Sequence, residues 1–342
     1  MKLKATFTSV VGLILLLTPL TSAAQTTASA GIGPLSNDPV WIGEGALFDE
    51  NFGLSVGTAG DVNGDGYADV IVGAPTHTAD HDYEGQAYVY LSSATGLADS
   101  PAWTAEGNQD DAKFGSSVGT AGDVNGDGYS DVIVGAPGDS YIQDYYGQAY
   151  VYLGSASGVA ASPAWTAEGN QVDAEFGYSV GTAGDVNGDG YSDVIVGARR
   201  DSNDQGTEGL VYVYLGSATG LADSPDWIAE GDQNGAKFGH SVGTAGDVNS
   251  DGYSDVIIGT YAGQAYVYLG SATGLAASPA WTAEDDQAYA YFGCAVGTAG
   301  DVNGDGYSDV VIGACEYDNG DQNRAGQAYV YLGSATGLAA SP

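Results

Sequence analysis

"FGLSVGTAGDVNGDGYADVIVGAP", residues 52–75, holds the pattern that decides the fold: an acidic, glycine-bearing loop between two short apolar segments. The nine letters of the loop, 61–69, return with few changes at 123, 185, 247 and 301. A tryptophan precedes every copy, and successive tryptophans are separated by 62, 62, 62 and 54 residues (Trp41, Trp103, Trp165, Trp227 and Trp281). A period of this size is typical of a repeat array or a propeller.

Each repeat offers four strands and no helical periodicity. One segment follows Phe52-Gly53, "DVIVGA" leaves the acidic loop, "QAYVYL" alternates, and "WTAEG" follows a turn rich in Gly, Ser and Pro. Four short antiparallel strands, repeated radially, predict an all-β fold, a β-propeller; a β-solenoid is the alternative, but its coils are shorter. The propeller domain is expected over 40–342, with repeats at about 41–102, 103–164, 165–226, 227–280 and 281–342.

The ends of the chain leave the number of blades open. The sequence stops at "GSATGLAASP", where the next Trp strand would begin, and Val40 to Gly43 forms an orphan strand of that type. Either this strand completes the last blade and closes a ring of five, or the chain is a fragment of a larger ring. Closure is favoured because strand edges need protection.

The acidic loop has the ligand pattern of a calcium site. Positions 1, 3, 5 and 9 are oxygen donors, the glycine at position 6 permits a sharp turn, and position 7 offers its backbone carbonyl. Magnesium, which prefers a stricter octahedron, fits less well. Position 12 is Val72 rather than the glutamate of an EF-hand, so the loop is expected on a β-hairpin. A solvated Asx turn is the alternative for one copy, whereas five intact copies favour calcium.

About five ions are therefore expected. The predicted ligands are Asp61, Asn63, Asp65, Tyr67, Asp69; Asp123, Asn125, Asp127, Tyr129, Asp131; Asp185, Asn187, Asp189, Tyr191, Asp193; Asp247, Asn249, Asp251, Tyr253, Asp255; and Asp301, Asn303, Asp305, Tyr307, Asp309. Ser250 replaces a non-ligand glycine in the fourth loop, and this change is expected to matter little.

Three motifs in fixed order resemble the FG-GAP repeat. They are Phe52-Gly53, the acidic loop, and Gly73-Ala74-Pro75. This repeat builds the propeller of integrin α subunits and occurs in many exported bacterial proteins. The resemblance implies a calcium-binding propeller that takes part in adhesion. Integrin propellers have seven blades and bind ligand beside a partner subunit, whereas this chain shows five repeats, so adhesion is an implication that fold alone does not establish.

The N-terminus predicts export. Residues 1–24 carry two lysines, an apolar run from Val10 to Leu17 and small residues before a cleavage site after Ala24 or Ala30, which indicates a signal peptide rather than a membrane anchor. A short linker over 25–39 follows. The mature chain keeps 5 basic and 44 acidic residues, a formal charge of −39, which disfavours nucleic acid and anionic membranes as partners. Salt adaptation and cation binding both account for this charge.

Strand alternation separates two faces. The acidic loops and the uniform "GSATGLAASPA" turns share one face, and the variable loops share the other. The basic residues Lys113, Arg199, Arg200, Lys237 and Arg324 and all three histidines fall in or beside the variable loops. Because loops on a rigid scaffold carry recognition, we expect the ligand there. The candidate residues are Tyr83, Tyr141, Tyr145, Tyr146, Arg199, Arg200, Tyr261, Tyr317 and Arg324, with Tyr289 and Tyr291 on the same rim. Solvated loops that tolerate change are the alternative.

Two further pairs are singled out. Cys294 and Cys315 flank the fifth acidic loop almost symmetrically, so hairpin pairing and export predict a disulfide, with two buried thiols as the alternative. The equivalent positions of the third repeat hold Tyr178 and Arg199, a pair suited to cross-strand contact. His77 and His81 are a minor zinc candidate.

Three functions compete. The first is a secreted or cell-surface, non-catalytic binding module that contacts a protein or glycan through the variable loops. The second is a secreted hydrolase on a propeller scaffold, but no Ser-His-Asp order or nucleophile elbow supports it. The third is a structural surface or matrix protein, for which charge and repetition would suffice.

Overall fold

The computed structural model describes residues 39, 41–138, 146–201, 206–285, 287, 289–318, 320 and 324–342. The predicted signal peptide, Val40, Tyr141 and Tyr145 lie outside these residues, so the predictions for them stay predictions.

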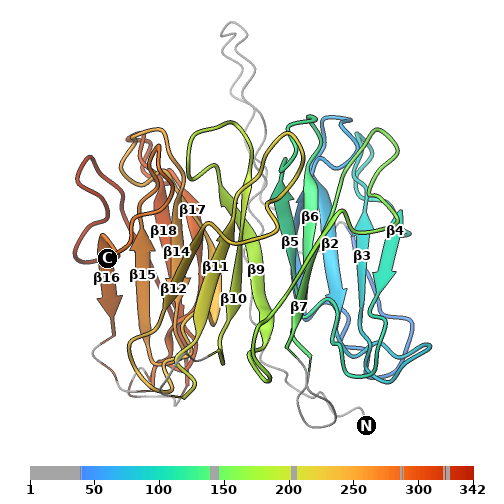
Figure 1. Cartoon of the computed structure of the whole chain (residues 1–342), viewed down its shortest axis with the longest axis horizontal. Coiled ribbons are helices and arrows are strands. Elements are labelled where there is room, and N and C mark those ends of the chain that lie inside the picture. Colours follow the sequence, from blue (N-terminus) through green and yellow to red (C-terminus); the bar gives the residue numbers. More distant parts are fainter. Residues whose placement is uncertain are drawn as a thin grey trace, which may run out of the picture.

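The described residues form antiparallel sheets arranged side by side, as the sequence predicts (Figure 1). The first strand of each sheet leads into the acidic loop: β1 (Ser55–Gly60), β5 (Ser117–Gly122), β9 (Phe176–Gly184), β13 (Ser241–Gly246) and β17 (Phe292–Gly300). The second strand leaves it: β2 (Asp69–Ala74), β6 (Asp131–Ala136), β10 (Asp193–Ala198), β14 (Asp255–Gly259) and β18 (Asp309–Ala314).

The outer half of each sheet comes from the two remaining segments. The third strands are β3 (Gln86–Tyr90), β7 (Gln148–Tyr152), β11 (Leu210–Tyr214), β15 (Gln264–Tyr268) and β19 (Gln327–Tyr331). The fourth strands are β4 (Trp103–Glu106), β8 (Trp165–Glu168), β12 (Trp227–Glu230) and β16 (Trp281–Glu284). Strands pair in chain order, which gives blades 1 to 4 four strands each and blade 5 the three strands β17-β18-β19. All four predicted strand types are confirmed, and the fold is a β-propeller.

Apolar clusters fill the spaces between successive blades. Between blades 1 and 2, for example, Val62, Ile71 and Val89 pack against Val118 and Val134. The second strands are buried along nearly their whole length, which explains their continuous apolar sequence. Most of the burial that stabilises a blade therefore comes from its neighbours.

The glycines of the Phe-Gly and Gly-Ala motifs lie where the backbones of adjacent blades come close together. A Cβ atom on Gly73 would stand 2.0 Å from the carbonyl oxygen of Gly115 in the next blade, and one on Gly115 would stand 2.6 Å from that of Gln86. The same collision occurs between Gly135 and Gly177. Only glycine allows the backbones of adjacent blades to approach this closely.

The tryptophans connect each blade to the following one. Trp103 in blade 1 stacks edge-on against Tyr152 in blade 2, with ring centroids 4.8 Å apart, and its Nε1 donates to the carbonyl of Ala160 at 2.8 Å. Trp41 makes the same contacts with blade 1, to Tyr90 and the carbonyl of Ala98. It therefore occupies the place of an outer-strand tryptophan from a preceding blade.

The sheets do not join into a closed ring within the described residues. Residues 41–45 belong to no strand, and the outer edge of β19 has no partner strand there. Val56, on the side of blade 1 that has no neighbouring blade among the described residues, is 44% exposed, whereas the equivalent Val118 of blade 2 is 7% exposed. On the opposite side of blade 5, Val302 is 57% exposed, where the equivalent Val62 is fully buried. Closure by the strand from Val40 to Gly43 and membership in a larger ring both stay predictions.

Candidate functional site

The acidic loops are 61–69, 123–131, 185–193, 247–255 and 301–309, called loops 1 to 5, and each joins the first two strands of its blade. In loop 3 the carboxylate of Asp185 accepts hydrogen bonds from the backbone N–H groups of Gly188, Asp189 and Gly190. The side-chain oxygen of Asn187 accepts from the N–H of Asp189 at 3.0 Å. The loop thus curls around the side chains at positions 1, 3 and 5.

The glycine at position 6 makes this curl possible. Gly190 has a φ of +93°, which is the left-handed region, and a Cβ built on it would meet no atom within 4 Å. Backbone conformation rather than space therefore demands glycine here.

The aspartate at position 9 has a different environment from the other three donors. Asp193 is fully buried; its Oδ2 accepts the N–H of Val186 at 2.8 Å and its Oδ1 accepts the N–H of Gly216 at 2.9 Å. It therefore ties the loop to the end of the third strand of its own blade. The same pair of bonds recurs at Asp69, Asp131, Asp255 and Asp309.

Burial and neighbouring charge act together to raise the pKa of the buried carboxyls of loops 1 to 4. Desolvation, opposed by the two backbone hydrogen bonds and reinforced by Asp185 and Asp189, raises the pKa of Asp193 to about 7. The same causes raise the pKa of Asp131 and of Asp255 to about 6. The three carboxyls of one loop are thus close enough to repel one another, which a bound cation would relieve.

The donor set fits calcium. Each loop supplies carboxylate, carboxamide and backbone oxygens and no nitrogen or sulfur donor, around a glycine turn. The carboxylates of a loop do not lie within 4.8 Å of one another as a group of three. Across the described residues, one group of three His, Cys, Asp or Glu side chains meets this limit, and it consists of His77, Glu84 and Glu106.

Adjacent loops are hydrogen-bonded to each other, which sequence reasoning missed. The hydroxyl of Ser192 in loop 3 accepts the N–H of Asp123 in loop 2 at 3.2 Å, and the N–H of Ser192 donates to the carbonyl of Asp123 at 2.9 Å. Equivalent pairs of bonds are made by Ser130 and Ser254, and the N–H of Ser308 donates to the carbonyl of Asp247 at 2.9 Å. The sequence feature that could have indicated these bonds is position 8 of the loop, which is Ser in loops 2 to 5 and Ala68 in loop 1.

The loop face that carries the β2–β3 type connections, called the variable-loop face, holds a row of stacked rings and cations. The guanidinium carbon of Arg199 lies 3.3 Å from the ring centroid of Tyr178, which confirms the predicted cross-strand contact. The Tyr178 ring lies 5.3 Å from His240, and the His240 ring lies 5.6 Å from Tyr261. Tyr261 in turn stacks at 4.4 Å on Tyr291.

Two ion pairs hold the arginines of this row, and its histidine is neutral. Glu175 pairs with both Arg199 and Arg200, at 3.1 Å from Nη1 of Arg200. Burial, with Arg199 and Lys237 nearby, lowers the pKa of His240 to about 4, so the imidazole is neutral at physiological pH. Sequence reasoning had not singled out Glu175.

A pocket of about 490 Å³ adjoins the end of the row, between blades 4 and 5. Tyr261, Tyr289 and Tyr291 line it together with the polar side chains of Gln233, Gln264, Gln287, Glu284 and Asp285. Tyr289 is 82% exposed, so an aromatic face is open to solvent at the pocket rim.

The other candidate residues of the variable-loop face stand apart from this row. Tyr83 is 49% exposed on blade 1. Tyr317 packs against the core between blades 4 and 5, and Arg324 pairs with Glu316 at 3.1 Å. The structure therefore brings together Arg199, Arg200, Tyr261 and Tyr291 of the predicted face, and it joins Tyr178 and His240 to them.

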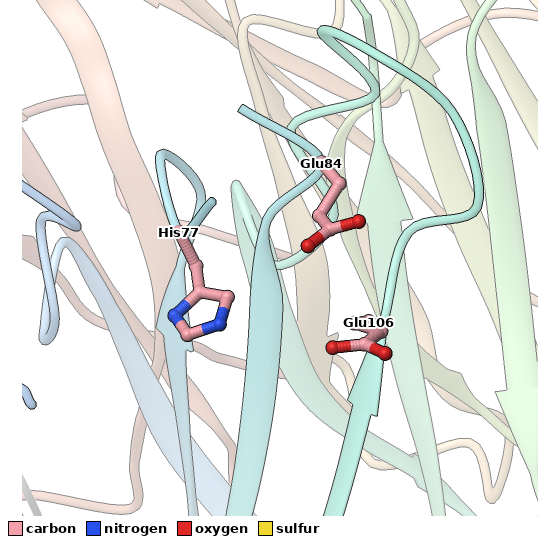
Figure 2. Close-up of side chains that lie close together, drawn as sticks. All are labelled: His77, Glu84 and Glu106. Atoms are coloured by element: carbon pink, nitrogen blue, oxygen red, sulfur yellow. The ribbon is translucent and has the colours of Figure 1, made fainter. Parts of the chain in front are cut away.

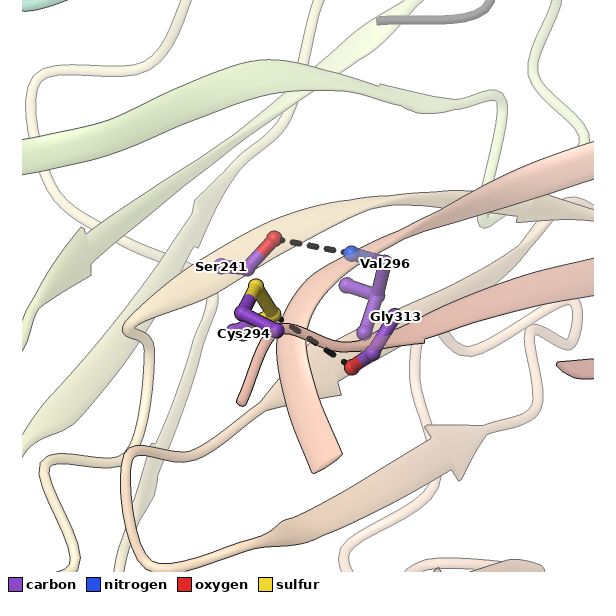
Figure 3. The surroundings of a disulfide bond; sticks show 5 residues. Ser241, Cys294, Val296 and Gly313 are labelled. Carbon is purple, nitrogen blue, oxygen red and sulfur yellow. Dashed lines mark hydrogen bonds between the residues drawn. A yellow bond between two sulfur atoms is a disulfide. The ribbon is translucent and has the colours of Figure 1, made fainter. Parts of the chain in front are cut away.

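Cys294 and Cys315 are joined by a disulfide, with Cα atoms 6.2 Å apart (Figure 3). Cys294 lies in an irregular part of the β17–β18 pairing, between Phe292 and Ala295. Two residues later the N–H of Val296 donates to the hydroxyl of Ser241 in blade 4 at 3.0 Å. The bond thus fixes the start of the blade 5 hairpin beside its contact with blade 4.

Family models match much of the chain. The FG-GAP repeat model matches 52–90, 114–153 and 176–214, and the FG-GAP-like repeat model matches 247–312. The chain belongs to the FG-GAP repeat family. The predicted resemblance to the integrin α propeller is thereby confirmed.

Integrin α subunits are among its relatives. Integrin alpha-V of Gallus gallus is 36% identical over 228 residues, which is 63% of this chain and 21% of that protein. Integrin alpha-4 of Xenopus laevis is 32% identical over 226 residues, 65% of this chain and 21% of that protein. The chain thus spans about a fifth of the length of these relatives. Among solved structures, Saccharomyces cerevisiae Sqt1 aligns over 79% of this chain and 59% of its own, with a TM-score of 0.46 and 11% identity.

Within the described residues, no helix has the length and apolar character needed to span a membrane.

Proposed function

We propose that this FG-GAP propeller is an exported, non-catalytic binding module that contacts a protein or glycan ligand through its variable-loop face. The observation that supports the proposal is the continuous row from Arg199 through Tyr178, His240 and Tyr261 to Tyr291. Aromatic rings and arginine are enriched where proteins recognise partners. The relatives named as integrin α subunits suit an extracellular or cell-surface role in adhesion.

The pocket beside Tyr291 favours a glycan within this proposal. Its tyrosine rings offer flat apolar faces for the C–H side of a sugar, and its glutamine, glutamate and aspartate side chains offer donors and acceptors for hydroxyl groups. A volume of about 490 Å³ accommodates a small ligand.

Calcium has a bracing role in the proposal. The ions would be held by the side chains at positions 1, 3, 5 and 9 and by the carbonyl at position 7 of each of the five loops. Calcium would neutralise clustered carboxylates and hold the first two strands of each blade. Calcium titration of the folded protein should saturate at five ions, and saturation at one or none would refute the calcium assignment.

The binding role is tested on a glycan and matrix-protein array, with calcium and with chelator. Tyr291→Ala and Arg199→Ala should each weaken binding of the captured ligand at least tenfold. Tyr67→Ala is the matched control, because Tyr67 is also exposed, at 43%, but lies on the acidic-loop face. Loss of binding in Tyr67→Ala alone would place the ligand on the wrong face for this proposal. Absence of any captured ligand would favour a structural surface or matrix protein.

A further inference from the structure

Blade 1 contains a buried carboxylate that the other blades do not have. Glu50, two residues before the FG pair, is only 3% exposed. At the same position the other four repeats have buried alanines, Ala112, Ala174, Ala236 and Ala290. A buried carboxylate carries a large desolvation penalty, and four blades fold with alanine there, so the fold does not require this glutamate.

Glu50 orients a buried histidine that is also confined to blade 1. Its Oε2 lies 2.9 Å from Nδ1 of His77, which is 8% exposed, while its Oε1 has no hydrogen-bond partner among the described residues. A carboxylate that accepts from Nδ1–H leaves the lone pair on Nε2. Histidine ligands of metals are held in this way, by a carboxylate on the ring nitrogen that faces away from the ion.

Two more carboxylates face the free side of the imidazole. Glu84, before β3, is fully buried, and its oxygens accept the backbone N–H groups of Ala79, Asp80 and His81. Glu106 ends β4 and is exposed. Ligand atoms of His77, Glu84 and Glu106 lie within 4.8 Å of one another, and Figure 2 shows the three side chains pointing toward a common region.

With His77 neutral, this convergence brings acceptors together without a donor between them. Ionised carboxylates only accept hydrogen bonds, and a neutral imidazole whose Nδ1 donates to Glu50 can only accept at Nε2. Three acceptors at this spacing call for a cation. The ligand atoms of a tetrahedral zinc ion stand about 3.4 Å apart, because each bond is about 2.0–2.2 Å.

We propose that His77, Glu84 and Glu106 bind one zinc ion on the variable-loop face of blade 1, with Glu50 as the residue that positions His77. One imidazole and two carboxylates suit zinc better than calcium or magnesium, which take oxygen ligands. Three protein ligands, one of them exposed, leave a fourth position open to water or to a group from a partner. This site is separate from the acidic loops and does not depend on the proposed ligand row. The minor zinc candidate from the sequence is corrected in one residue: His81 contacts Asp110 at 3.3 Å and is not in the cluster.

Blade 3 provides a matched comparison within the chain. Asp201, Glu208 and Glu230 occupy the positions of His77, Glu84 and Glu106, and Asp201 accepts the hydroxyl of Tyr212 at 2.6 Å. The double variant Glu50→Ala/His77→Asp therefore gives blade 1 residues with which blade 3 already folds. It removes the imidazole and its positioning carboxylate and keeps both glutamates.

The experiment is isothermal titration with zinc chloride of the full mature chain in millimolar calcium, which occupies the oxygen-rich sites. The wild type should bind one zinc ion. Glu50→Ala/His77→Asp and Glu106→Gln should each weaken zinc binding at least tenfold, and Glu50→Gln should weaken it about 10- to 100-fold through loss of the positioning contact. His81→Gln, an exposed histidine in the same loop, should leave zinc binding unchanged.

Circular dichroism and thermal unfolding in calcium establish that each variant is folded. The proposal is overturned if the folded wild type binds no zinc under these conditions, or if Glu50→Ala/His77→Asp binds it as tightly as the wild type. Equal losses in His77→Gln and His81→Gln would also overturn it, since they would indicate zinc held loosely by surface histidines. In that event Glu50 and His77 form a buried ion pair without a metal.

Discussion

Replacing Asp193 with asparagine separates the two roles of an acidic loop, because this side chain is buried and hydrogen-bonded while Asp189 in the same loop is exposed. Its two oxygens accept the buried N–H groups of Val186 and Gly216 at 2.8 and 2.9 Å. Asparagine keeps one acceptor oxygen and places an NH2 group against the other N–H. One buried N–H then lacks an acceptor, which costs about 1–3 kcal/mol of unfolding free energy without any metal.

The comparison variant is Asp189→Asn in the same loop. Asp189 is exposed, and its carboxylate accepts from the Tyr191 N–H and the Asn187 side chain, which water can replace. In chelator its unfolding free energy should therefore stay within about 0.5 kcal/mol of wild type. In calcium at about 100 times the dissociation constant of the loop, loss of the ion should lower stability by about 2.7 kcal/mol.

The assay is urea-induced unfolding of both variants at pH 8, in chelator and in calcium. This pH is chosen because burial raises the pKa of Asp193 to about 7, and the carboxylate must be ionised. The hydrogen-bond reasoning is refuted if Asp193→Asn unfolds like the wild type in chelator. It is also refuted if Asp189→Asn loses as much stability there as Asp193→Asn.

Three further perturbations test other features. Burial lowers the pKa of His240 to about 4, against 6.5 for the free side chain, so between these values the unfolded state binds a proton that the folded state does not. The unfolding free energy therefore falls as the pH drops from about 6.5 to 4. His240→Gln in saturating calcium should reduce this pH dependence, and an unchanged pH dependence would contradict a neutral imidazole in the folded protein. Ser250→Gly should stabilise loop 4 by about 1 kcal/mol, since Ser250 has a φ of +58° where the other loops have glycine; no gain in urea midpoint would show that this strain is absent. Cys294→Ser/Cys315→Ser should lower the unfolding free energy by about 3 kcal/mol in the loop-entropy model, measured against the oxidised wild type, and equal midpoints would argue that the bridge adds nothing.

The strands were predictable because recognisable residues mark the strand ends in each repeat. Phe-Gly precedes or begins the first strand, the acidic loop separates the first two strands, and tryptophan begins the fourth. The pattern of loop donors is contained within nine residues, and their binding of calcium stays a prediction. The Tyr178–Arg199 contact followed from hairpin register alone.

Features that join distant segments were not predictable from the sequence. Glu50, His77, Glu84 and Glu106 come from separate segments of blade 1, and nothing in their local sequence requires them to meet. Positive φ at Ser250 was also not readable from the sequence, and the expectation that this serine matters little stays a prediction that Ser250→Gly tests. Sequence patterns show which groups a loop offers, but backbone conformation decides what a substitution there costs.

The serine bonds between neighbouring loops imply that ions would not enter the five loops independently. Ser192 clamps the backbone of Asp123, the first donor of the preceding loop, through both its hydroxyl and its N–H group. Ordering one loop therefore lowers the entropy lost when its neighbour is ordered, which is a source of positive cooperativity without any change of shape. We expect a calcium isotherm with a Hill coefficient above one, and Ser192→Ala should divide it into two less cooperative parts.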